Sequence, residues 1–264
     1  MKILPPLVLF LGIGIFLPML YHFIFYKKTV ISNIPLSTWT LTGFIAFLFF
    51  PTFLFRKHWE KALLFAYNKF WFVVGVVQMD NNFWETLAKF LVIIIFIALT
   101  GDKGKEIFKQ KRSATIFGYW VGLCYGIGEA LTLAIIGYLP ILNRIFGINL
   151  FMYFTTWYSV WERAYAIQIH AIIGSLIGLG FYHYFGLTKK WWLLFFFIIG
   201  ILYHELVDGL VLVMMYFPRL SWIKFLSLNF YTVTLPLLLI VGYLLLVIAY
   251  QQTKNILLKT QEAL

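Results

Sequence analysis

Long apolar runs separated by short polar segments dominate the sequence. A run of about 18 or more apolar residues is long enough to cross the hydrocarbon core of a membrane. Such runs lie near residues 3–26, 37–55, 84–100, 115–138, 162–186, 191–216 and 230–250. The pattern therefore predicts an all-α polytopic transmembrane bundle of about seven or eight spanning helices.

Two stretches do not fit a simple pattern of spans and loops. Residues 62–78 carry Asn68 and Lys69 inside an apolar run, so they can form an eighth span, a re-entrant element or an interfacial helix. Residues 146–160 are aromatic and short, which suits the headgroup region of a membrane. The first apolar run has no small-residue cleavage site, and we expect it to remain as an anchor.

The composition supports a membrane protein and leaves no room for a soluble domain of useful size. The chain is 62% hydrophobic and 12% charged, whereas a soluble domain carries about 25% charged residues. Each spanning helix needs neighbours against which to bury its polar positions. We therefore expect residues 1–264 to form a single integral membrane domain, with a motif-bearing catalytic core at 80–210.

The net charge of +11 points to lipid rather than to nucleic acid. Lys and Arg cluster in short loops, above all at 101–112, where such residues hold topology and meet anionic headgroups. No soluble stretch carries a basic stripe with interleaved aromatics, so nucleic-acid binding is not expected. The expected location is a prokaryotic cell membrane, with the basic loops on the cytoplasmic side.

Six ionisable residues lie where lipid disfavours them. A charge at the bilayer centre costs about 2.5–3.5 kcal/mol even on lenient scales, and such residues usually face a cavity and mark function. At about 1.5 Å per residue, three of them lie roughly 12–14 Å from the less basic ends of their helices. The sequence therefore predicts one shared site formed by Glu85, Lys89, Glu129, His170, His204 and Asp208.

Local spacing supports this convergence. His204 and Asp208, like Glu85 and Lys89, are four residues apart and share a helix face, so the second pair is expected to form an ion pair. Glu205 lies about 100° round the helix and is expected to face elsewhere.

Glycines near two of the polar residues add a packing argument. Small residues let helix backbones approach closely. The glycines at 122, 126 and 128 precede Glu129, and those at 174 and 178 follow His170. Close packing of these two helices would bring Glu129 and His170 together.

Other polar residues have simpler interpretations. Glu162 and Arg163 stand where a helix enters the membrane, as an interfacial ion pair or as part of a catalytic site. His183, between two tyrosines near a helix end, is expected to be an interfacial anchor. Cys124 lies inside an apolar segment and is expected to have a packing role.

The motifs resemble those of the PrsW and YhfC families of intramembrane metalloproteases, relatives of the CAAX-prenyl endopeptidases and of the scaffold subunit of γ-secretase. Those families carry EExxK/R, a glycine-rich helix with Glu or His, a helix with His, and HxxxN/D. The matching segments here are 85–89, 122–129, 162–174 and 204–209, in the same order. Thr86 replaces the second glutamate of the first motif.

The residues and the resemblance together predict metal-assisted hydrolysis of a peptide bond in a membrane protein or peptide substrate. His170 and His204, with Glu129 as a candidate third ligand, would hold a divalent metal, expected to be zinc. The metal would acidify its bound water and polarise the scissile carbonyl.

The remaining residues receive roles in proton transfer and orientation. The resemblance implies that Glu85 accepts the proton of water and passes it to the leaving amine. Lys89 would keep Glu85 ionised, and Asp208 would orient His204 or steady the tetrahedral intermediate. Glu85 and Glu129 can exchange roles. If the second glutamate of the motif is essential, Thr86 makes this chain a pseudoenzyme.

Two other classes of protein remain open. The same polar residues can tie helices together in a non-catalytic membrane scaffold or chaperone. Buried carboxylates and histidines also build proton relays in coupled transporters, although the sequence has no repeated half of the kind that many transporters carry. The oligomeric state does not follow from the sequence.

Overall fold

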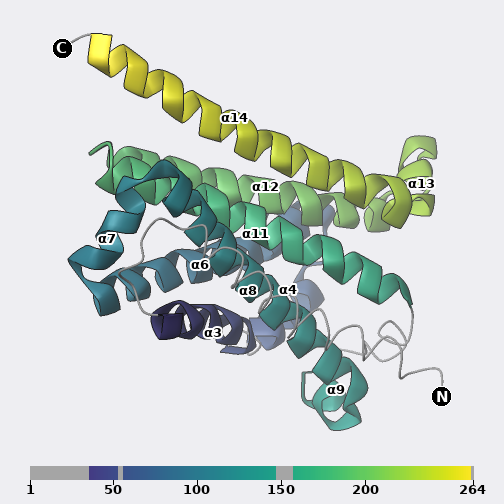
Figure 1. Ribbon diagram of the computed structural model, residues 1–264. Helices are drawn as coiled ribbons and strands as arrows, with labels where there is room; N and C mark the ends of the chain where they lie inside the picture. Colours follow the sequence, from purple (N-terminus) through teal and green to yellow (C-terminus); the bar gives the residue numbers. More distant parts are fainter. Residues whose placement is uncertain (1–35, 53–55, 147–156, 263–264) are drawn as a thin grey trace.

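A computed structural model describes residues 36–52, 56–146 and 157–262 of the chain. These residues are 92% helical and contain no strand, which confirms the predicted all-α class. In lipid a backbone must satisfy its hydrogen bonds within the segment or in a closed barrel, so long apolar segments favour helices. Figure 1 shows the helices packed side by side, with α14 along one edge and α3 on the opposite side.

Five helices among the described residues are long and apolar enough to cross a membrane, which supports a multi-pass membrane protein. The predicted total of seven or eight is not confirmed. The first predicted span, 3–26, lies outside the described residues, and the second appears as the shorter helix α3 (Leu36–Thr52). The five are Phe70–Thr100, Lys111–Gly137, Tyr158–Phe185, Trp191–Tyr216 and Phe230–Thr253.

The ambiguous stretch 62–78 does not form a single element. Its first residues end helix α4 (Arg56–Ala66), and its last residues begin the following span through α5 (Phe70–Phe72) and the π-helical turn η2 (Val73–Gln78). The polar residues Asn68 and Lys69 lie at the break between them. The span predicted at 84–100 therefore starts earlier, because η2 continues directly into α6 (Met79–Thr100).

Helices α8 (Lys111–Tyr138) and α11 (Trp157–Phe185) form the centre of the bundle. In each, 78% of the most apolar stretch is buried, against 22–39% in the other three spans. Glycines line their interface: a Cβ atom built at Gly118 would overlap the Gly174 backbone, and one at Gly122 would overlap that of His170. The close packing predicted from the glycine pattern is present, and Gly118 extends it by one turn.

The remaining helices surround this pair. Helix α3 packs on α8, while α12 (Trp191–Tyr216) and α14 (Leu235–Glu262) pack on α11. Short helices join the spans: α7 (Asp102–Lys109) lies at one end, and α9 (Pro140–Phe146) and α13 (Ser221–Leu228) lie toward the other (Figure 1). The π-helical turn η3 (Phe230–Thr234) leads into α14.

His183 is not the interfacial anchor that its tyrosine neighbours suggest. Its side chain is fully buried, stacks on Trp192 of α12 at 5.0 Å between ring centroids, and lies 3.1 Å from the Thr253 hydroxyl of α14 through Nε2. The reason is tertiary: the next helix, α12, and the distant helix α14 together cover this face of α11. Cys124 is buried, as expected.

Candidate metal centre

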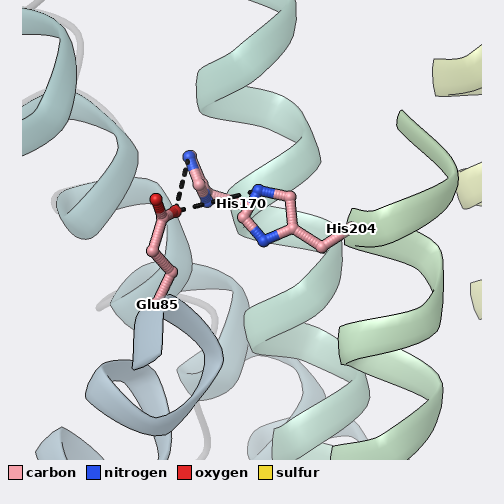
Figure 2. Close-up of side chains that lie close together, drawn as sticks. All are labelled: Glu85, His170 and His204. Carbon is pink, nitrogen blue, oxygen red and sulfur yellow. Dashed lines mark ion pairs between the residues drawn. The ribbon is translucent and has the colours of Figure 1, made fainter. Parts of the chain in front are cut away.

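Three side chains from three helices meet in the interior of the bundle. Glu85 comes from α6, His170 from α11 and His204 from α12, and one ligand atom of each lies within 4.8 Å of the others. Glu85 Oε2 is 3.9 Å from His170 Nε2 and 3.7 Å from His204 Nε2. Figure 2 shows the Glu85 carboxylate pointing toward both imidazoles. All three residues are buried, as a site shielded from lipid requires.

Glu129 belongs to the same neighbourhood but makes different contacts. Its Oε2 is 2.5 Å from His170 Nε2, and its Oε1 accepts a hydrogen bond of 2.5 Å from Arg163. Arg163 also binds Glu162, so its guanidinium bridges two carboxylates. Glu129 thus lies beside the group of three rather than within it, and Arg163 connects that group to the start of α11.

Lys89 lies behind Glu85 and is fully buried. Its ammonium donates a hydrogen bond of 2.8 Å to the backbone carbonyl of Glu85 and lies 3.8 Å from the ring centroid of Tyr125. The bond between the two residues therefore runs to the backbone, not to the carboxylate as the spacing had predicted. The ring face of Tyr125 offers a second stabilising contact for the cation.

Asp208 is held beside His204 by a glutamine that the sequence did not single out. Asp208 Oδ2 lies 3.6 Å from His204 Nε2 and accepts a hydrogen bond of 2.8 Å from Gln78. Gln78 ends the π-helical turn η2, a type of turn that is frequent at functional sites.

Two further amides of α6 bind acidic side chains. Asn81 donates to Glu85 Oε1 at 2.9 Å, and the fully buried Asn82 donates to Glu205 Oε2 at 2.8 Å. Glu205 is therefore fixed by α6, although it does not line the cavity described below. The spacing of polar residues at 78, 81, 82 and 85 could have revealed these amides from the sequence. They were missed because the predicted span started only at residue 84.

Thr86, the departure from the family motif, does not face the site. It is fully buried, lines no part of the cavity, and its methyl group lies where α6 meets Gly200 of α12. Glu85 alone of this pair points inward. Because neighbouring residues of an α-helix are rotated by about 100° from each other, positions 85 and 86 of the motif face different sides of α6.

The polar residues open onto one cavity of about 540 Å³. Glu85, Glu129, His170, His204 and Asp208 line it together, so the predicted convergence of these five residues is present. Lys89 lies behind this surface. Residues outside the 80–210 segment also contribute, among them Glu60 and Phe230.

The donor set of Glu85, His170 and His204 fits a divalent transition metal in type and spacing. Ligand atoms about 2.0–2.1 Å from a tetrahedral zinc ion lie about 3.3–3.4 Å apart. The distances of 3.7 and 3.9 Å from Glu85 are slightly larger. One feature fits less well: neither His170 Nδ1 nor His204 Nδ1 has a hydrogen-bond partner among the described residues, whereas metal-bound histidines almost always donate their second N–H.

The fold and the site together define a helical, multi-pass membrane protein with a buried carboxylate and imidazole group beside a cavity. No family model, no curated protein and no solved structure matches this chain. The resemblance to the PrsW and YhfC families accordingly depends on the four motifs alone.

Proposed function

We propose that this protein is an intramembrane metal-dependent endopeptidase that cleaves a membrane-associated protein or peptide. The observation that carries the proposal is the buried group of Glu85, His170 and His204, contributed by three separate helices. Charged and polar groups inside a membrane are costly and are usually retained for function. The order of the motifs along the chain, which resembles that of intramembrane metalloproteases, supports the same class.

In this proposal Glu85, His170 and His204 hold a divalent cation, expected to be zinc. When bound, such a cation supplies Lewis acidity, polarising a carbonyl group and making water more acidic. Glu129 is the candidate general base, because its carboxylate faces the cavity with Oε2 2.5 Å from His170 Nε2. This arrangement exchanges the roles that the sequence suggested for Glu85 and Glu129.

The other residues position these groups. Gln78 and Asn81 hold the carboxylates of Asp208 and Glu85 by hydrogen bonds of 2.8 and 2.9 Å. Asp208 Oδ2 lies 3.6 Å from His204 Nε2, on the side of the imidazole that would bind the cation, and would add another carboxylate beside it. Lys89 supplies a buried positive charge behind Glu85 and fixes its backbone carbonyl.

A non-catalytic scaffold is the second candidate, and one observation favours it. The close contact of His170 with Glu129, and of Glu129 with Arg163, ties α8 to α11 without any ion. The unpartnered Nδ1 atoms of both histidines also depart from the usual surroundings of a metal ligand. In a scaffold these residues would stabilise helix packing alone.

Metal content separates the two candidates. Purified protein loaded with zinc and then desalted is expected to retain about one ion per chain, and a His170→Ala/His204→Ala double variant is expected to lose it. His183→Gln is the matched control, because His183 is a buried histidine outside the cavity. A wild-type protein that holds no metal, and whose thermal stability falls in the double variant, supports the scaffold.

Proteolysis in a membrane extract tests the activity directly. Cleavage is expected to disappear with a chelator, to return when zinc is added, and to be strongly reduced by Glu85→Gln or Glu129→Gln. Glu106→Gln, on the exposed surface of α7, is expected to behave as wild type. Cleavage that persists with chelator and in the Glu85 variant would contradict the proposal.

A further inference from the structure

The cavity has the opposite charge to the protein as a whole. The chain carries 21 Lys and Arg against 10 Asp and Glu. Yet five of those ten acidic residues line the cavity, and Arg163 is the one Lys or Arg among the described residues that line it. Besides the three carboxylates beside the histidines, the acidic residues are Glu60 and Glu162.

The surrounding shell does not cancel this charge. Among the described side chains around the cavity, Arg56 binds Asp80 and also lies 3.8 Å from Glu60. Glu205 lies behind the cavity and Lys89 lies on the other side of Glu85, so these four residues add two acids and two bases. With neutral histidines the described lining keeps a formal excess of four negative charges, and a bound dication would leave two. The polar lining is also incompletely satisfied, because His204, 4% exposed, has no hydrogen-bond partner for Nδ1 among the described residues.

Apart from the amides Gln78 and Asn81, the rest of the described lining is apolar and comes from several helices. It includes Leu133 of α8, Val211 and Leu212 of α12, Phe230 of η3 and Leu235 of α14. A ligand that fits such a surface has an apolar body and a single cationic group. Ammonium and guanidinium groups carry only hydrogen-bond donors, and carboxylates accept them.

We propose that the substrate segment taken by this cavity is an apolar peptide bearing a lysine or arginine side chain, with Glu60 and Glu162 selecting for the positive charge. Both carboxylates line the cavity and neither belongs to the candidate metal ligands. The inference rests on the proposed function only in taking the ligand to be a peptide. An anionic segment would be repelled by the excess of carboxylates.

Binding of three matched peptides tests the selectivity. The probes are blocked leucine–alanine peptides with an uncharged fluorophore and a central lysine, norleucine or glutamate. Full-length protein in nanodiscs of zwitterionic phosphatidylcholine is titrated by fluorescence anisotropy, with empty nanodiscs as background. We expect the lysine peptide to bind about tenfold more tightly than the norleucine peptide, which corresponds to about 1.4 kcal/mol, and the glutamate peptide to bind most weakly.

Variants locate the preference within the cavity. Glu60→Gln and Glu162→Gln are each expected to narrow the ratio of lysine to norleucine affinity several-fold, and high salt to narrow it further. Glu106→Gln, exposed and paired with Lys109 on α7, is expected to leave the ratio unchanged. A thermal melt of each variant verifies that it is folded.

The outcomes separate this inference from the proposed function. Equal affinity for lysine and norleucine peptides, or a ratio that neither cavity variant alters, overturns the selectivity. Turnover of all peptides without preference would do the same while leaving the hydrolase proposal in place. Preferential binding of the lysine peptide without any cleavage supports the selectivity and counts against the hydrolase.

Discussion

Gly122 of α8 lies directly against the backbone carbonyl of His170 on α11, and a Cβ atom at position 122 would overlap that oxygen. The approach of these two backbones sets the distance between α8 and α11 at the depth of the candidate metal centre. It also brings Glu129, about two turns further along the same face of α8, to within 2.5 Å of His170 Nε2. Packing and site geometry are therefore coupled through one glycine.

Gly122→Ala is expected to destabilise the protein by roughly 1–3 kcal/mol, the usual cost of overpacking a close interface. The added methyl group must push His170 away, so zinc retention is expected to fall as well. Thermal unfolding in detergent and metal analysis measure both effects. Gly75→Ala is the matched control, because a Cβ atom there has no neighbour within 4 Å. Equal stability of the two variants would contradict this account of the interface.

Arg163→Met removes the cation that bridges Glu129 and Glu162. The side chains of Arg163 and Glu129 are 14% and 13% exposed, and breaking a buried pair from one side costs up to about 3–5 kcal/mol. The Arg163→Met/Glu129→Gln double variant also removes the buried carboxylate charge that has lost its cation, so it is expected to regain part of the stability. A double-mutant cycle measures this effect. Arg219→Met, at an exposed position, is the control. If the stability losses of the two single variants add up to the loss of the double variant, Arg163 and Glu129 are not coupled.

Lys89→Met compares the contribution of Lys89 to catalysis with its contribution to the stability of the helix bundle. Methionine has a similar length and no charge, so it keeps the packing but loses the hydrogen bond to the Glu85 carbonyl. A hydrogen bond from a charged group contributes about 1.5–3 kcal/mol, and we expect a loss of that size in the free energy of unfolding. We also expect a fall of about tenfold or more in peptide cleavage, equivalent to about 1.4 kcal/mol in the barrier. Measuring melting temperature and cleavage on the same preparation gives both numbers. Undiminished cleavage would remove Lys89 from the proposed catalytic machinery.

The amino-acid sequence predicted the helical class and five of the ionisable residues that line the cavity. Glu85, Glu129, His170, His204 and Asp208 were chosen because ionisable groups in apolar segments are costly, and the structure brings all five to one cavity. The glycine pattern likewise predicted the close contact of α8 with α11. The metal, the activity and the limits of the catalytic core remain predictions.

The sequence did not reveal the helix rotations and long-range contacts that complete the site. Gln78 was missed because the π-helical turn η2 and the continuous helix from Phe70 were not expected. Three features each depend on a neighbour far along the chain: the orientation of Thr86 toward α12, the bridge from Arg163 to Glu129, and the contact of buried His183 with Thr253 of α14.

The physical reason lies in the range of the forces involved. Hydropathy and the cost of placing charge in lipid depend on each segment by itself. The sequence alone therefore determines that these helices form and which of their residues must face a polar site away from lipid. How closely two helices approach, and which face each turns to its neighbour, depends on the shapes of both. Only the tertiary structure therefore decided that Glu85 lies between two histidines while Glu129 pairs with Arg163.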